Sequence, residues 1–138
     1  MSAVEFLDSN IVLYAYSPEN DRKRTVAAEL LKRAVKGECV ISVQVLSEVA
    51  SALLYKMTPR ASANDVSEIL DLLAPIPTIC PDQEVVRRAV QANAQFGIHF
   101  YDGMIVAAAE RAGCTKIWSE DLNPGQEYFG VKVENPFA

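Results

Sequence analysis

The sequence is poor in the residues on which many kinds of active site depend. It has one histidine, His99, and three widely separated cysteines with no CxxC pair. A single histidine excludes ribonuclease chemistry that needs two, and a Ser-His-Asp triad is disfavoured because no G-x-S-x-G segment is present. Cysteines that are odd in number and lack metal-ligand spacing argue against a disulfide or zinc framework. We expect Cys39, Cys80 and Cys114 to be small buried apolar groups in a reduced cytoplasm.

Long apolar runs and a surplus of positive charge are also missing. No run approaches the ~20 residues of a membrane-spanning helix, so no membrane partner is expected. The first residues, MSAVEFLDSN, have no basic leader, apolar core or cleavage site, and we predict no signal peptide. The net charge of −5 supplies no general basic surface for nucleic acid.

The basic residues that are present are unevenly distributed. Nearly half of the 13 fall in one predicted helix: Arg22, Lys23, Arg24, Lys32, Arg33 and Lys36. Charge runs usually form a solvated helix face, which is the favoured interpretation. A contact surface for phosphates is the alternative.

The apolar pattern predicts a single α/β domain over residues 1–138. Half of the residues are apolar, enough for a core in a chain of this length. Helices are predicted at 22–35, 42–57, from Ser62 or Asn64 to 74, from about Pro81 or Asp82 to 96, and at 101–112. Strands are predicted within 4–16 and at 38–41, 78–80, 115–118 and 131–133. Strands that alternate with helices of this length predict a central, mostly parallel sheet of four to five strands sandwiched between helices.

Four acids stand out against this pattern. Asp8 interrupts an apolar strand, where Asp is disfavoured, and a buried carboxylate needs a partner or a metal. Glu48 lies at the edge of the apolar stripe of its helix, Asp102 opens the helix YDGMIVAAAERAG, and Asp121 lies in WSEDLNPGQ. Each also has an ordinary explanation: a turn cap for Asp8, a solvated boundary for Glu48, a helix cap for Asp102 and a turn for Asp121.

The predicted topology brings these acids toward one place. Ligands of open parallel sheets bind beyond the carboxyl ends of the strands. Asp8 lies at the exit of the first strand, Glu48 and Asp121 follow later strands, and Asp102 begins a helix packed alongside. Clustered carboxylates repel one another unless a cation is bound, and such oxygen ligands suit Mg²⁺ or Mn²⁺. The pattern therefore predicts metal-assisted in-line displacement at phosphorus.

The segments that carry the acids resemble a known family. FLDSNIVLYAY, SVQVLSEVA, FYDGMIVAAAERAG, IWSEDLNPGQ and the closing GVKVENPF are similar, in order and spacing, to the four acidic motifs and tail of PIN-domain proteins. The similarity is greatest to VapC-type toxins of prokaryotic toxin–antitoxin pairs and covers essentially the whole chain. It implies a Mg²⁺- or Mn²⁺-dependent endoribonuclease, an RNA substrate, a homodimer, and a cognate antitoxin that blocks the active cleft.

The resemblance assigns catalysis and metal binding to Asp8, Glu48, Asp102 and Asp121. Asn10 and Ser119 fall on supporting polar positions. Gly103 stands where the family usually has alanine, which should loosen the helix start by up to ~1 kcal/mol. Val49 and Ala50 follow Glu48 where many relatives carry an aromatic residue.

The expected roles of the four acids differ. Asp8 and Asp102 should be the main metal ligands, Asp121 should complete that site or hold a second ion, and Glu48 should orient the attacking water. The antitoxin should present a basic side chain, such as arginine, to the acids. The homodimer is expected to use an apolar helix face near Leu53, Leu54, Tyr55, Leu70 and Leu73.

Other functions remain possible from the residues alone. A phosphorylated receiver module would need adjacent acids after the first strand and a lysine after the fifth, which this sequence does not offer. A haloacid-dehalogenase-like phosphatase would need a D-x-D pair, but Asn10 occupies the second position. A catalytically idle PIN-like domain that serves only as a binding scaffold is the third alternative.

Overall fold

The computed structural model of the chain describes residues 4–138, and its helices and strands alternate along the sequence. The order is β1 (Val4–Leu7), α1 (Ser9–Ala15), α2 (Asp21–Val35), β2 (Cys39–Ser42), α3 (Val43–Tyr55), α4 (Ala63–Leu73), β3 (Thr78–Ile79), α5 (Gln83–Phe96), α6 (Phe100–Arg111), β4 (Cys114–Trp118), β5 (Glu127–Tyr128) and β6 (Val131–Glu134).

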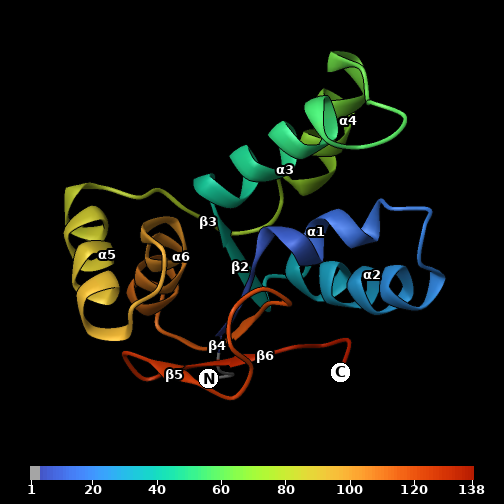
Figure 1. The fold of residues 1–138 in the computed structure, drawn as a ribbon. Coiled ribbons are helices and arrows are strands. Elements are labelled where there is room, and N and C mark those ends of the chain that lie inside the picture. Colours follow the sequence, from blue (N-terminus) through green and yellow to red (C-terminus); the bar gives the residue numbers. More distant parts are fainter. Residues whose placement is uncertain (1–3) are drawn as a thin grey trace.

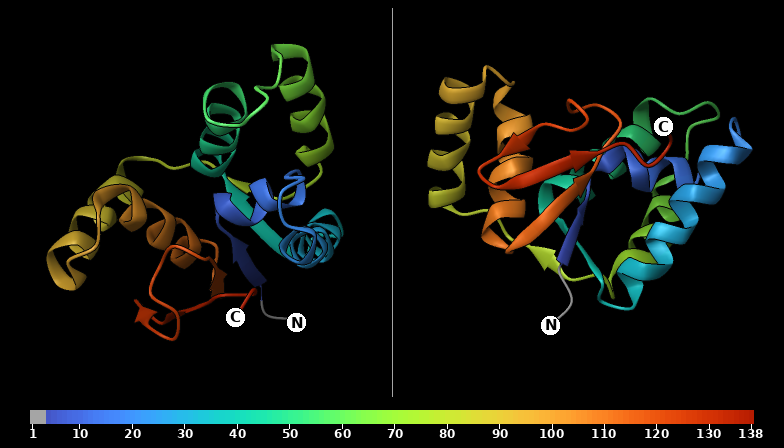
Figure 2. Two further views of the ribbon diagram at one scale, coloured as in Figure 1. Left: turned by 45° about the vertical axis from the view of Figure 1, so that its right-hand side comes forward. Right: turned by 90° about the horizontal axis from the view of Figure 1, so that it is seen from below.

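The strands form one six-stranded sheet in the order β3-β2-β1-β4-β6-β5, parallel throughout except for the antiparallel β5–β6 pair. Helices cover it from two sides, with α1 to α4 on one side and α5 and α6 on the other (Figures 1 and 2). The predicted α/β fold with a mostly parallel sheet between helices is confirmed. The sheet exceeds the expected four to five strands because β5, only two residues long, was not predicted.

The chain reverses its direction across the sheet next to β1. It runs outward from β1 through β2 to β3, and then returns through α5 and α6 to β4 on the opposite side of β1. The carboxyl ends of β1 and β4 therefore lie side by side, and the backbone N–H of Asp8 donates to the carbonyl oxygen of Trp118 at 3.0 Å. This is the type of location at which open α/β sheets bind ligands.

Strand burial follows from the helices on both faces. All four residues of β2 are buried, as are Phe6 and Leu7 of β1, and this explains why these strands are mainly apolar. Cys39 and Cys114 lie in this core, and burial raises the pKa of Cys39 to about 11 and that of Cys114 to about 12. The prediction was wrong for the third cysteine, since Cys80 is exposed.

Side-chain caps set the helix boundaries that the sequence indicated. Ser42 accepts from the backbone N–H of Val45 at the start of α3, and Ser62 forms a capping box with Asp65 at the start of α4. Gly97 ends α5 in the left-handed conformation, with a φ of 70°.

The apolar segment after Asp8 was predicted wrongly. It was expected to continue the first strand, but residues 9–15 form the short helix α1, which Asp8 caps. Ile11 and Val12 are β-branched and fully buried, so their burial in tertiary contacts outweighs their preference for strands.

Helices α5 and α6 pack closely at Gly103. A Cβ atom on Gly103 would lie 2.7 Å from the carbonyl oxygen of Ala89 in α5. The glycine therefore permits a close approach of two backbones. Helix α6 begins regularly at Phe100 with His99 as its N-cap. No helix in residues 4–138 is long and apolar enough to cross a membrane.

Candidate active site

The four acids lie on elements that meet at the carboxyl edge of the parallel strands. Asp8 ends β1, Glu48 lies in the second turn of α3 after β2, Asp102 lies in the first turn of α6, and Asp121 follows β4. Their proximity is evident from the effect of neighbouring charges on the pKa values of Asp8 and Asp102. The negative charges of Glu48 and Asp121 act on Asp8, and that of Asp121 also acts on Asp102.

Asp8 is the most enclosed of these acids, with 5% of its surface exposed. One carboxylate oxygen accepts from the backbone N–H of Ser9 at 2.7 Å, and the other accepts from the hydroxyl of Ser119 at 2.8 Å. Burial raises its pKa from 3.8 to about 6; the two hydrogen bonds oppose this shift, and repulsion by Glu48 and Asp121 adds to it. Asp8 therefore caps α1, and burial disfavours the charged form of its carboxyl group.

Ser119 and Asn10 connect Asp8 to Asp121. The fully buried Ser119 hydroxyl donates to Asp8 and accepts from the backbone N–H groups of Asp121 and Leu122, at 3.2 and 3.3 Å. The Asn10 amide donates to the Asp121 carboxylate at 3.0 Å, and its carbonyl oxygen accepts from the backbone N–H of Glu120 at 3.2 Å. These two polar residues therefore hold the loop that carries Asp121 against β1 and α1.

The same loop is fastened from its other side by Glu120. Its carboxylate accepts from Lys23 at 2.6 Å and from the Tyr14 hydroxyl at 2.8 Å. Burial acts to raise the pKa of Glu120, but the hydrogen bonds from Lys23 and Tyr14 outweigh it and lower the pKa. The Lys23 ammonium also lies 5.3 Å from the ring centre of Phe137, so the C-terminal tail packs on the network.

Asp102 is half-buried at the start of α6. Burial raises its pKa, the neighbouring His99 lowers it, and Asp121 raises it further. The Nδ1 atom of His99 accepts from the backbone N–H of Tyr101 at 3.2 Å, so this histidine orders the entry to the helix.

Glu48 is positioned by a residue of its own helix. The side-chain amide of Gln44 donates to the Glu48 carboxylate at 3.4 Å and to the backbone carbonyl of Tyr101 at 3.0 Å. Gln44 was not predicted as a site residue. The only sequence signal for Gln44 is its place one helical turn before a motif glutamate.

The donor set suits a hard divalent cation, but it is not gathered into a finished metal centre. In residues 4–138 no three His, Cys, Asp or Glu side chains are grouped as a metal-binding cluster. The available donors are carboxylate oxygens whose repulsion a Mg²⁺ or Mn²⁺ ion would relieve. Glu48 and Asp102 are partly exposed, so their side chains have room to turn toward Asp8 and Asp121.

The basic residues of α2 are mostly engaged within the molecule. Ion pairs link Lys23 to Glu120, Arg24 to Asp21, Lys32 to Glu29 and Arg33 to Glu5 and Glu38, and Arg22 donates to the carbonyl oxygen of Phe137. This pattern favours the interpretation of a solvated, ion-paired helix face over a dedicated phosphate-binding surface.

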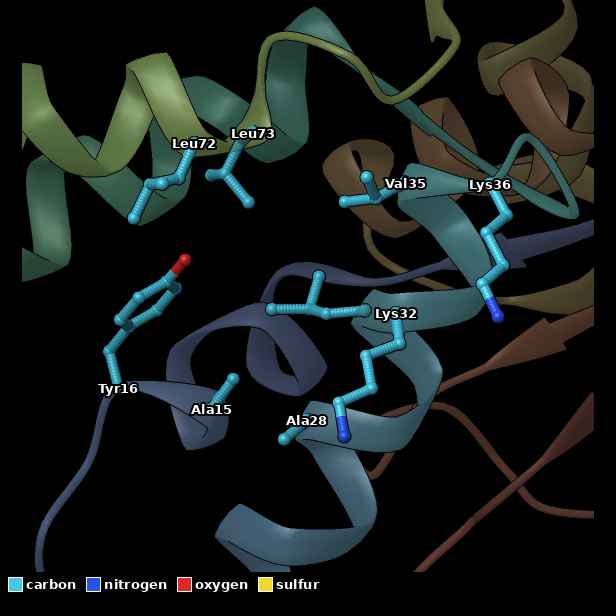
Figure 3. A pocket seen from close by; sticks show the side chains of 9 residues that line it. Ala15, Tyr16, Ala28, Lys32, Val35, Lys36, Leu72 and Leu73 are labelled. Atoms are coloured by element: carbon cyan, nitrogen blue, oxygen red, sulfur yellow. The ribbon is translucent and has the colours of Figure 1, made fainter.

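Two hollows flank the α1 helix. A pocket of about 270 Å³ opens beside the acids, lined in part by Asn10, Tyr14 and Asp121. A separate apolar cleft of about 570 Å³ lies at the other end of α1, between α2 and α4. Figure 3 shows Leu72 and Leu73 of α4 facing Tyr16 across this cleft, with Lys32 on the α2 side.

Comparison with known proteins agrees with this architecture. No match was found among curated protein sequences. Among solved structures, the chain is similar to one in a toxin–antitoxin complex from Klebsiella pneumoniae (TM-score 0.71, 20% identity, 98% of each chain). It is also similar to DNA-bound VapBC from Salmonella typhimurium (TM-score 0.70, 16% identity, 99% of each chain) and to VapC20 from Mycobacterium tuberculosis, described as a sarcin-ricin loop cleaving toxin (TM-score 0.66, 13% identity, 85% of this chain and 89% of that one).

At these identities the structural likenesses establish a shared fold. The assignment to a family comes from the PIN domain model, which matches residues 6–125 and so spans all four acids. The predicted family is confirmed: the chain belongs to the PIN-domain family.

Proposed function

We propose that this protein is a Mg²⁺- or Mn²⁺-dependent endoribonuclease and the toxin of a toxin–antitoxin pair. The observation that carries the proposal is the buried Asp8 carboxyl, whose pKa of about 6 reflects burial and the nearby charges of Glu48 and Asp121. A folded protein gains no stability from such an arrangement, whereas a metal-dependent hydrolase uses it. The description of the M. tuberculosis neighbour supports RNA as the substrate class.

The proposed roles of the site residues differ. Bound metal would supply charge neutralisation at the phosphate and activation of water. Asp8, Asp102 and Asp121 would hold it, with Ser119 and Asn10 fixing two of these carboxylates. Glu48 has the longest side chain of the four acids and its charge acts on Asp8, so we assign to it the orientation of the attacking water and the acceptance of its proton.

The test is RNA cleavage by purified protein with and without Mn²⁺. We expect cleavage that depends on metal, is abolished in Asp8→Asn, and is unchanged in Glu29→Gln, which alters an exposed acid of α2. Full activity in Asp8→Asn, with contaminating nucleases excluded, would overturn the site. Absence of cleavage by the unchanged protein would favour the second candidate, an idle scaffold.

We propose that the antitoxin occupies the apolar cleft and reaches the acids from there. The cleft begins at Ala15 and Tyr16, at the end of α1, and Asp8 caps the start of the same helix. Seven helical residues span about 10 Å, so a chain seated in the cleft needs only a few more residues to present a basic side chain to the carboxylates. The neighbours that are toxin–antitoxin complexes support such a partner.

Expression in cells tests the toxin role. We expect the protein alone to arrest growth in the cytoplasm and a co-expressed antitoxin to restore it, with rescue weakened by Leu72→Asp in the cleft. A protein that cleaves RNA in vitro but is harmless at high expression would refute the toxin assignment and leave the enzyme intact.

The homodimer surface expected from the sequence is partly buried. That choice was wrong for Leu53 and Leu73, which are 4% and 2% exposed and belong to the core. On that face Tyr55 and the neighbouring Leu72 stay exposed, at 67% and 62%, and Leu72 lines the cleft proposed for the antitoxin. A second exposed apolar face lies on α5 and α6, where Val86, Val90 and Tyr101 are 42%, 54% and 59% exposed. We propose this face as the dimer surface. Val90→Glu should convert a dimer to a monomer in sedimentation measurements, and a monomeric unchanged protein would count against the proposal.

A further inference from the structure

Gln44 connects two of the candidate acids across the carboxyl edge of the sheet. It lies in the first turn of α3, one helical turn before Glu48, and its amide nitrogen contacts the Glu48 carboxylate at 3.4 Å. The same nitrogen donates to the backbone carbonyl of Tyr101, the residue before Asp102, at 3.0 Å. Among residues 4–138, Gln44 is the one donor of a hydrogen bond to the Glu48 carboxylate.

The orientation of the Gln44 amide follows from these two neighbours. Both are acceptors, so the nitrogen must face them; a flipped amide would place its oxygen against a carboxylate and a carbonyl. The amide oxygen is left buried and without a partner in residues 4–138. A buried acceptor without a donor is unfavourable, and an apolar side chain of similar size would avoid it. Packing alone therefore does not account for a glutamine here.

The location of this link matters because α3 and α6 come from opposite sides of the sheet (Figure 1). Glu48 projects from α3 and Asp102 from α6, so their separation depends on how the starts of these two helices are held together. Gln44 spans that junction, and it contacts both the acid on one side and the backbone beside the acid on the other.

We propose that Gln44 is a positioning residue for the hydrolytic reaction. It holds the Glu48 carboxylate in one rotamer and fixes the start of α6, so that Glu48 and Asp102 face the same ion and the same water. This inference rests on the proposed metal-dependent nuclease function and adds to it a residue outside the four acids.

The test compares Gln44→Met and Gln44→Asn with a control on the same helix. Methionine keeps the length but removes the donor, and asparagine keeps the donor but is one methylene too short to reach both acceptors. Ser47→Ala, on the exposed side of α3, removes a hydroxyl that contacts only the backbone of its own helix. Mn²⁺ affinity by calorimetry, single-turnover cleavage at saturating Mn²⁺, and KM for RNA are measured on all four proteins.

Loss of residues that orient metal ligands commonly costs about 10- to 100-fold in metal affinity or activity. We expect both Gln44 variants to lose about tenfold in Mn²⁺ affinity and in single-turnover rate, with KM for RNA unchanged. The melting temperature of Gln44→Met should be no lower than that of the unchanged protein, because methionine removes the unpartnered buried oxygen. Ser47→Ala should match the unchanged protein. A Gln44→Met or Gln44→Asn protein that stays within about twofold in both quantities overturns the inference.

One further measurement separates this inference from the proposed function. In metal-free protein, NMR couplings should show one Glu48 rotamer, and averaging over several in Gln44→Met. Averaging already present in the unchanged protein refutes the positioning role, whatever the activity. Absence of Mn²⁺ binding and cleavage in the unchanged protein, with a single Glu48 rotamer that Gln44→Met releases, refutes only the nuclease.

Discussion

Replacing Asp8 with asparagine should stabilise the metal-free protein while it abolishes activity. The native pKa of about 6, against an ordinary value of 3.8, means that folding disfavours the charged carboxyl by about 3 kcal/mol well above pH 6. Asparagine has no charge to bury. Its NH₂ group would face the Ser119 oxygen, which already accepts from two backbone N–H groups, so the hydrogen bond that the Ser119 hydroxyl donates is lost. We assign this loss about 1 kcal/mol. The expected net gain is about 1–2 kcal/mol at about pH 8.

The sign of the pH dependence is the stricter test. Between pH 3.8 and about 6 the folded protein binds the Asp8 proton more tightly than the unfolded chain does, so the stability contributed by this group falls as pH rises through that window. The gain in folding stability from Asp8→Asn should therefore be largest at about pH 8 and should vanish or reverse near pH 4.

Urea unfolding with a chelator present measures this difference across the pH range. The slope of stability on denaturant should be the same for both proteins, so that midpoints compare directly. Glu29→Gln, at an exposed acid, should show no such pH-dependent difference. An Asp8→Asn protein that is less stable than the unchanged protein at every pH would show that the Asp8 carboxylate is stabilised in the fold rather than strained.

Four other outcomes are expected. Titrating chelator-treated protein with Mn²⁺ should release protons and raise the melting temperature, and calorimetry without either signal would remove the metal mechanism. Glu48→Gln should abolish cleavage with a smaller loss of metal affinity than Asp102→Asn, and equal losses would contradict the division of roles. Lys23→Met should slow cleavage without altering the far-UV spectrum, because it frees the loop that carries Asp121; an unchanged rate would argue against that tether. Gly103→Ala should lower the melting temperature, since overpacking of about 1–3 kcal/mol exceeds the gain of up to ~1 kcal/mol in helix propensity, and a higher melting temperature would refute the close contact.

The long amphipathic helices and the topology were accessible from the sequence because their determinants are local. Caps at Ser42 and Ser62 and the stop at Gly97 are short-range signals, and the alternation of strands and helices dictates a parallel sheet. Helix α1 and strand β5 were missed for the opposite reason. Both are short, and their conformations depend on packing and pairing with distant segments.

In the candidate site, too, some features could be predicted from the sequence and others depend on contacts between distant residues. The convergence of the four acids at one sheet edge could be inferred from the order of strands and helices. The sequence offers a turn cap and a buried acid as alternative explanations of Asp8, whereas in the structure the same side chain caps α1 and is buried with a raised pKa. The network of Lys23, Tyr14 and Glu120 could not be inferred, because it joins residues nearly a hundred positions apart through ordinary surface residue types.

The close contact between Gly103 and Ala89 has a consequence for protein engineering. Helix α6 cannot be exchanged alone for that of a relative with alanine at position 103, because the incoming methyl group would meet the backbone of α5, which cannot move aside as a side chain can. The smallest exchangeable block is the helical hairpin of residues 83–111, which brings Asp102 with it. Any chimera that exchanges this whole block also replaces Asp102, so the packing of α5 against α6 and the acid of α6 are exchanged together.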